Sequence, residues 1–119
     1  MLPQGIIRID REAPASESNI GQDVLLAGKS DTKLWNAFTD QTGQFSVGHW
    51  ASGSCKLKVS YDENEFCLLL SGKAILTDEA GQSCEFGPGE AFTIAAGFKG
   101  TWESVGDVVK IYAAFEAAR

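Results

Sequence analysis

Basic residues are scarce and scattered in this sequence. Ten lysines and arginines stand against sixteen aspartates and glutamates, which gives a formal net charge of -6 at pH 7. Proteins that bind DNA or RNA cluster lysine and arginine on one face in order to neutralise backbone phosphates. We therefore expect no nucleic-acid partner.

Long apolar runs are missing as well. No stretch approaches the roughly 20 apolar residues that a helix needs to cross a bilayer. Residues 1–10 lack both the basic start and the apolar centre of a secretory signal. The sequence accordingly predicts a soluble, cytoplasmic protein with no membrane partner.

Cysteine and histidine are rare. The three cysteines, Cys55, Cys67 and Cys84, are odd in number and contain no closely spaced pair, which indicates neither a disulfide framework nor a zinc site. We expect three reduced thiols that mostly fill the core. His49 is the only histidine of the chain.

The sequence does contain enough apolar material for one core. Its 119 residues and 44% hydrophobic content suit a single globular unit. We divide the chain into an N-terminal segment, residues 1–34, with an edge strand and a surface connection, and a β-barrel, residues 35–119. Within the first part, residues 2–9 are an apolar stretch that either pairs at a sheet edge or reaches another subunit.

Short strand-like segments recur about every ten residues, separated by turns that contain glycine. Turns are expected at Gly43, Gly72, Gly81 and Gly106, and we find no pattern of a long helix. This spacing predicts an all-β sandwich or barrel.

Residues 53–72 form the centre of this pattern. Leu57, Val59 and Tyr61 alternate with polar residues, which is the period of a strand with one side inside a sheet. An acidic turn follows, and a second apolar strand comes after it.

That second strand begins with an unusual carboxylate. Residues 66–70 are an unbroken apolar run, which predicts a strand covered on both faces. Glu65 has the parity of Cys67, so its carboxylate is expected to point inward, where an unpaired charge is costly.

The spacing of two blocks is specific. Gly53, five residues, Val59-Ser60-Tyr61, three residues, Glu65, six residues and Gly72 reproduce the first cupin motif, and residues 89–97 resemble the second. The resemblance to the cupin superfamily implies a double-stranded β-helix, or jelly roll of the RmlC-like type, with a ligand site in the barrel mouth. Further segments resemble the ureidoglycine aminohydrolase cupin domain family, also called cupin type three: 61–62, 64–65, 70–72, 77–81, 100–103 and 110–112.

The resemblance also implies where a metal would bind. In metal-binding cupins the positions of Val59, Tyr61 and Gly100 are histidines, and that of Glu65 is a carboxylate. Only Glu65 remains here, so we predict no metal and no other cofactor. His49 lies outside both motifs and is expected to be a partly exposed strand residue with one hydrogen bond; whether it joins Glu65 around an atypical metal is left open.

The motif positions bring Tyr61 and Glu65 together at the barrel mouth, with open space at Gly100 for a small molecule. Trp102 lies on the same side of its strand as Gly100, and Trp50 comes from another strand, so both offer flat walls to a ligand. The alternative is that both tryptophans are core or interface residues.

Lys110 and Tyr112 share one side of the last strand. The opposite side, which includes Val109 and Ile111, is apolar and is therefore predicted to be core. If the Lys110 side borders the cavity, its ammonium is a natural partner for Glu65 or for an anionic ligand. Otherwise Lys110 is an exposed strand residue.

Two neighbouring groups keep structural alternatives. Glu65 is either functional or a carboxylate bonded to Tyr61 or to backbone N–H groups of the turn. Cys67 either faces the cavity or is a buried, inert thiol.

Three functions follow from these residues. The first is metal-free binding of a small polar metabolite by Trp50, Tyr61, Glu65, Trp102, Lys110 and Tyr112. The second is an enzyme similar to ureidoglycine aminohydrolase, acting on a ureide or related carbon-nitrogen substrate, with Glu65 as catalytic acid or base and Lys110 stabilising negative charge. The third is a structural or interaction protein that forms a homodimer through residues 1–9 and a sheet face.

Overall fold

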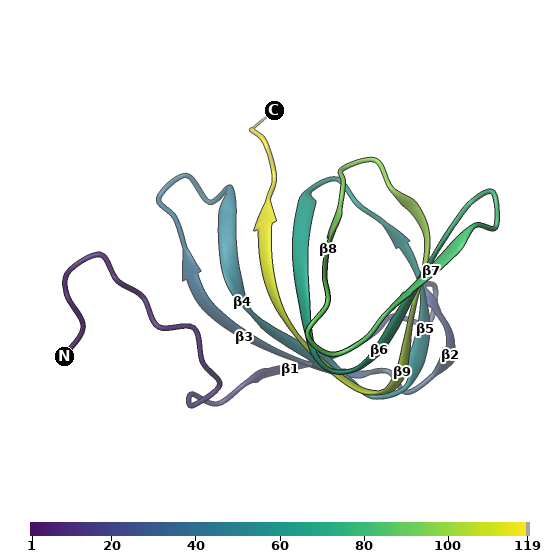
Figure 1. The fold of residues 1–119 in the computed structure, drawn as a ribbon, viewed down its shortest axis with the longest axis horizontal. Helices are drawn as coiled ribbons and strands as arrows, with labels where there is room; N and C mark the ends of the chain where they lie inside the picture. Colours follow the sequence, from purple (N-terminus) through teal and green to yellow (C-terminus); the bar gives the residue numbers. More distant parts are fainter. Residues whose placement is uncertain (119) are drawn as a thin grey trace.

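Nine β-strands run through the residues that the computed structural model describes, 1–118. This part of the chain contains no helix that is long and apolar enough to cross a membrane. The all-β class expected from the sequence is confirmed (Figure 1). In chain order the strands are Ser16–Asn19 (β1), Leu25–Gly28 (β2), Asp31–Thr39 (β3), Phe45–Ser52 (β4), Cys55–Ser60 (β5), Asn64–Asp78 (β6), Ser83–Phe86 (β7), Ala91–Ile94 (β8) and Lys99–Phe115 (β9).

The two longest strands, β6 and β9, pair with each other antiparallel over almost their whole length. Their first and last halves have different neighbours. In one half, β6 pairs with β8, and β9 pairs with β4, which is followed by β3 and β1. In the other half, β6 pairs with β7, and β9 pairs with β5, which is followed by β2. The result is a sheet that curls into a jelly roll open at one end (Figure 1).

Bends in β6 and β9 allow both strands to pass from one half of the barrel to the other. Gly72 has a φ of 73° and Gly106 a φ of 77°, a backbone conformation that favours glycine. The pairing shifts register here, between Leu69 and Lys73. The turns that the sequence predicts at these glycines are therefore wrong: each is a bend within one continuous strand.

The predicted hairpin turns at Gly43 and Gly81 are confirmed. Gly43 lies in the connection between β3 and β4, and Gly81 in that between β6 and β7. The carboxylate of Asp78 stabilises the second turn, because it accepts hydrogen bonds from the backbone N–H groups of Ala80 and Gln82.

The core lies between the two halves of the barrel, on the inner sides of β6, β8 and β9. Trp102 is its largest residue and is 2% exposed. The stacked rings of Phe86 and Phe92, with centroids 4.0 Å apart, pack against this cluster. Its buried members are Cys67, Leu69, Ala74, Leu76, Ile94, Trp102 and Val108.

Two predictions about strand faces are wrong. The run 66–70 is covered on one face only: Cys67 and Leu69 are fully buried, whereas Phe66 is 41% exposed. On β9 the inner side carries Lys110 and Tyr112, and the apolar side with Ile111 faces outward. Both errors have the same cause. The outer side chains of these two strands are at least as apolar as the inner ones, so hydrophobicity does not identify the buried side.

Residues 1–15 precede the first strand. They leave the barrel beside β1 and β3 as an extended N-terminal arm, drawn in purple in Figure 1. Several aliphatic side chains of the arm are exposed to solvent, namely Leu2, Ile6, Ile7 and Ile9.

Candidate functional site

A cavity of about 620 Å³ lies in the open end of the barrel. Its lining comes from β3, β4, β5, β6 and β9, so residues far apart in the chain meet there. All six residues predicted to bind a ligand are among those that line it: Trp50, Tyr61, Glu65, Trp102, Lys110 and Tyr112. The structure brings the predicted set together, and ligand binding itself stays a prediction.

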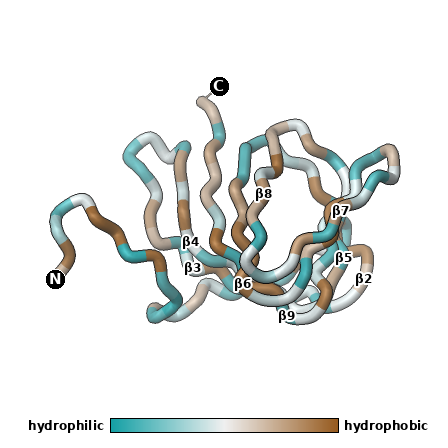
Figure 2. The backbone as a smooth tube through the Cα atoms, viewed as in Figure 1, coloured by the Kyte–Doolittle hydropathy of each residue, from teal (hydrophilic) through white to brown (hydrophobic). Residues whose placement is uncertain are grey.

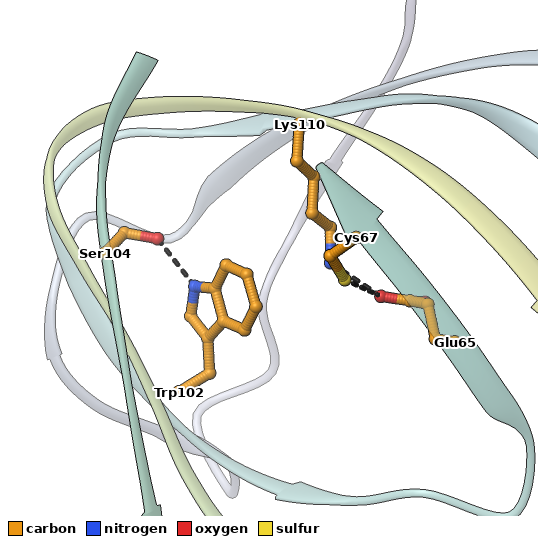
Figure 3. Close-up of polar contacts among 5 residues, drawn as sticks. All are labelled: Glu65, Cys67, Trp102, Ser104 and Lys110. Atoms are coloured by element: carbon orange, nitrogen blue, oxygen red, sulfur yellow. Dashed lines mark hydrogen bonds and ion pairs between the residues drawn. The ribbon is translucent and has the colours of Figure 1, made fainter. Parts of the chain in front are cut away.

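The centre of the site is an ion pair. The Lys110 ammonium donates a hydrogen bond to Glu65 Oε2 at 2.7 Å, and the two side chains are only 7% and 15% exposed (Figure 3). Lys110 borders the cavity, as one of the two sequence alternatives proposed, and is not an exposed strand lysine. The pairing follows from topology, because β6 and β9 are neighbours and both side chains point inward.

Two indole rings surround the ammonium. Lys110 Nζ lies 4.3 Å from the ring centroid of Trp102 and 4.9 Å from that of Trp50. The rings meet edge to face, with an interplanar angle of 85°. Their negative faces stabilise the cation, which offsets part of the cost of removing it from water.

Trp102 is held in place by serines. Its Nε1–H donates to Ser104 Oγ at 2.8 Å (Figure 3). Ser52 Oγ donates to the same oxygen at 2.8 Å. Because Trp102 is also buried in the core, it is both a core residue and a wall of the cavity. The two sequence alternatives for this residue are therefore compatible.

Cys67 belongs to the ion-pair cluster. Its Sγ donates to Glu65 Oε2 at 3.2 Å and lies 3.6 Å from Lys110 Nζ. Burial raises the pKa of the Cys67 thiol to about 12, and the negative charge of Glu65 adds to this while Lys110 opposes it. Since the thiolate is the nucleophilic form, Cys67 is an inert thiol, as one alternative proposed.

Two tyrosines, Tyr61 and Tyr112, line the cavity. Burial, followed by the charge of Glu65, raises the pKa of Tyr61 and also that of Tyr112, so both are neutral hydrogen-bonding groups. The Tyr112 hydroxyl donates to Asn36 Oδ1 at 2.7 Å, and the Tyr61 ring packs edge-on against Phe98. In this site Glu65 has Lys110 and Cys67 as its partners rather than Tyr61.

Sequence reasoning missed several polar residues of the site. Asn36 donates to Thr39 Oγ1, which in turn bonds Ser46 Oγ, and all three line the cavity. Strand alternation could have identified Asn36, because it lies two residues after Leu34 and therefore on the same side of β3. Alternation could not have identified Thr39, because β3 shifts register between Asn36 and Phe38.

The donor set does not fit the metal site of metal-binding cupins. Of the four corresponding positions only Glu65 carries a ligand group, and its Oε2 is taken by the Lys110 ammonium. No group of three or more histidine, cysteine, aspartate or glutamate side chains suited to a metal occurs in residues 1–118. The expectation of open space at Gly100 is also wrong, since a Cβ there would collide with the Thr77 carbonyl oxygen.

His49 lies away from the cavity. It is 5% exposed and points to the outer side of β4, beside Trp35 and residues 9–12 of the arm. Its Nδ1 has no hydrogen-bond partner within the described chain. The expectation of a partly exposed, hydrogen-bonded histidine is therefore wrong, and His49 and Glu65 line different pockets.

Comparisons with known proteins agree with this fold. A family model described as the EutQ-like cupin domain matches residues 39–112. Comparison with curated proteins gives no match. The jelly-roll cupin fold and the resemblance to cupin type three are thereby confirmed.

Three solved structures are similar. A DUF861-family protein of unknown function from Pseudomonas syringae superposes with a TM-score of 0.79 at 25% identity, over 89% of this chain and 46% of that one. The EutQ protein of Clostridium difficile has a TM-score of 0.64 at 16% identity, over 72% and 63%. A putative ethanolamine utilization protein Q from Salmonella typhimurium has a TM-score of 0.65 at 16% identity, over 96% and 100%.

The relatives differ in length. This chain spans about half of the Pseudomonas protein and less than two thirds of the Clostridium protein. The likeness to the two ethanolamine utilization proteins shows the fold alone.

Removing one partner of the buried ion pair should destabilise the barrel. Lys110→Met leaves the Glu65 carboxylate buried without its partner, so we expect the free energy of unfolding to fall by about 3–5 kcal/mol. The double variant Glu65→Gln/Lys110→Met, which carries no buried charge, should recover most of this loss. Urea denaturation measures all three proteins.

A matched control is the exposed pair Lys73–Glu85, whose side chains are more than half exposed at an N–O distance of 3.9 Å. Lys73→Met should cost about 1 kcal/mol or less. Equal losses for Lys73→Met and Lys110→Met would contradict the expected cost of leaving the Glu65 carboxylate buried without a partner.

His49 should make stability depend on pH. Burial and the charge of Arg11 lower its pKa below the usual 6.5, and Asp10 opposes them only in part. The unfolded chain therefore binds the proton more readily, so the free energy of unfolding should fall as the pH drops through 6.5. Denaturation at a series of pH values tests this, with His49→Gln as the control; an unchanged slope in the variant would show that other groups cause it.

Proposed function

Because the chain belongs to the EutQ-like cupin domain family, we propose that it binds a small, neutral, polar molecule in the barrel mouth without a metal ion. The observation that carries this proposal is the Lys110–Glu65 pair, which lies in a cavity whose walls are mostly apolar and aromatic. A buried ion pair is poor evidence for a purely stabilising role, since apolar replacements are often as stable.

The pair favours a particular ligand chemistry. Lys110 offers N–H donors and Glu65 offers a carboxylate acceptor, within 2.7 Å of each other. Their charges cancel, so a ligand with a net charge gains no Coulombic advantage over a neutral one. A neutral molecule with both a carbonyl or hydroxyl oxygen and an N–H or O–H donor would pair with both groups.

The walls favour a ligand that also has an apolar part. Leu57 and Val59 of β5 and Trp50 of β4 line the cavity. Asn36 and Ser46 provide further hydrogen-bonding groups near the mouth. A few polar groups in a mostly apolar cavity of this size are typical of small-molecule sites.

A thermal-shift series tests this function. Ureides, sugars, amino acids and small carboxylates are added separately, and we expect a neutral ureide or sugar to raise the melting temperature most. Glu65→Gln/Lys110→Met should abolish the shift, because it removes both charged groups and retains the size of the site.

The control for that series is Lys73→Met/Glu85→Gln, which removes an exposed ion pair and should keep the shift. A shift that persists in the cavity variant, or the absence of any shift across all four classes, would contradict the proposal.

An enzyme acting on a ureide or related carbon-nitrogen substrate is the second candidate. It is supported by the proximity of an acid or base, Glu65, to a cation that would stabilise developing negative charge, Lys110. Ammonia release from ureides, lost in Glu65→Gln while the circular dichroism spectrum is unchanged, would support this candidate. Binding without turnover would contradict it.

The proposed location is the cytoplasm. All three cysteines are free, and Cys84 is exposed. Unpaired exposed thiols persist in reducing compartments, which supports this location. A structural or interaction role as a homodimer is the third candidate function, and the exposed aliphatic arm supports it.

A further inference from the structure

A second cavity lies beside the one in the barrel mouth. It has a volume of about 720 Å³ and lies at the end of β5, against the turn that precedes β2. Leu57, Val59 and Tyr61 line both cavities. Because three residues of one segment belong to both, the two cavities are contiguous. We call the second one the side cavity, and its other lining residues are Asp23, Val24, Lys58, Ser60 and Glu63.

The side cavity lies where β2 no longer covers the edge of β5. The backbone N–H of Lys58 donates to the Val24 carbonyl at 2.8 Å, and next to this bond the chain turns away, because the N–H of Leu25 donates to the Gly21 carbonyl. Every second residue of a strand directs its backbone groups to the same edge, so the N–H and C=O of Ser60 point to the edge that β2 leaves uncovered. In residues 1–118 no strand pairs with Ser60 on this edge.

The charge of the side cavity differs from that of the mouth. In the mouth one carboxylate and one ammonium cancel, whereas the side cavity has the carboxylates of Asp23 and Glu63 and the single ammonium of Lys58. One negative charge is left over among its lining residues, and the whole chain has a formal net charge of -6. A cation therefore gains a Coulombic advantage in the side cavity that it does not have in the mouth.

Tyr61 lies close to the charged groups of both cavities. Burial is the main reason why its pKa is raised, and the negative charges of Glu65 and Glu63 add to this effect. The Tyr61 hydroxyl is thus within electrostatic reach of one carboxylate from each cavity.

The wall that the two cavities share is mostly apolar. Hydrophobic and hydrophilic residues alternate along β5 (Figure 2). Leu57 and Val59 are two of the hydrophobic ones, and together with the Tyr61 ring they line both cavities. A molecule that reaches from the mouth into the side cavity would place an apolar linker against them.

We infer that the ligand of the barrel mouth extends into the side cavity and ends there in a primary ammonium group beside Asp23 and Glu63. This inference rests on the proposed function, which concerns the neutral end of the ligand in the mouth. A primary ammonium has three N–H donors. The two carboxylates and the backbone carbonyl of Ser60 supply three acceptors along the same cavity. The ligand class is a neutral polar head, an apolar linker and a terminal amine.

Two series of ureas test this inference. One consists of n-alkylureas, and the other of ω-aminoalkylureas with the same chain lengths, which differ from the first only in the terminal ammonium. Isothermal titration calorimetry of the full chain measures their dissociation constants. At the best chain length we expect the aminoalkylurea to bind about fivefold more tightly, the gain typical of a partly exposed ion pair. The gain should shrink at high salt, because salt screens exposed charges.

Variants of the side cavity should change this gain in opposite directions. Asp23→Asn/Glu63→Gln removes both carboxylates, so the two kinds of urea should bind to it equally tightly. Lys58→Met removes the competing cation and should increase the gain. Glu85→Gln is the matched control, because Glu85 is an exposed carboxylate on β7 that lines neither cavity, and it should leave the gain unchanged.

The outcomes separate this inference from the function on which it rests. Equal binding of both series to the wild type, or a gain that persists in Asp23→Asn/Glu63→Gln, would overturn the inference and leave the proposed function intact. Binding of neither series would also overturn it, and the thermal-shift series with all four ligand classes would then decide separately on the proposed function.

Discussion

The rest of the structure depends on the long antiparallel pairing of β6 with β9. Each strand takes part in both halves of the barrel, and their paired bends near Gly72 and Gly106 set the curvature. The same pairing places Glu65 and Lys110 on neighbouring strands with inward side chains. The cavity and its ion pair are thus direct products of strand topology, rather than additions made by loops.

The ion pair also explains why this cavity differs from that of a metal-binding cupin. Glu65 occupies the one ligand position that this chain retains, and a lysine ammonium is its partner there. The surrounding indole rings complete the environment of a cation. Residues on three strands therefore hold a fixed positive charge in a cavity that stays neutral as a whole, because the carboxylate balances it.

Much of the fold could be predicted from the sequence, because alternation and glycine spacing fix where strands lie. Which face of a strand is inside could not, since β9 has apolar side chains outside and Lys110 inside. Motif spacing brought Tyr61 and Glu65 to the cavity, and strand alternation indicated Trp102, Lys110 and Tyr112. Motif spacing failed at Gly100, where the close approach of the β6 backbone fills the expected space. The environment of His49 could not be predicted, because it depends on the arm.

A lysine differs from a metal ion in one respect that matters for physiology. Its ammonium is covalently part of the polypeptide, so Lys110 cannot be removed by chelators or exchanged for a competing ion. The cation in the barrel mouth is supplied at translation and has a fixed stoichiometry of one per chain. A cupin built in this way would keep its charge balance when the metal supply of the cell changes.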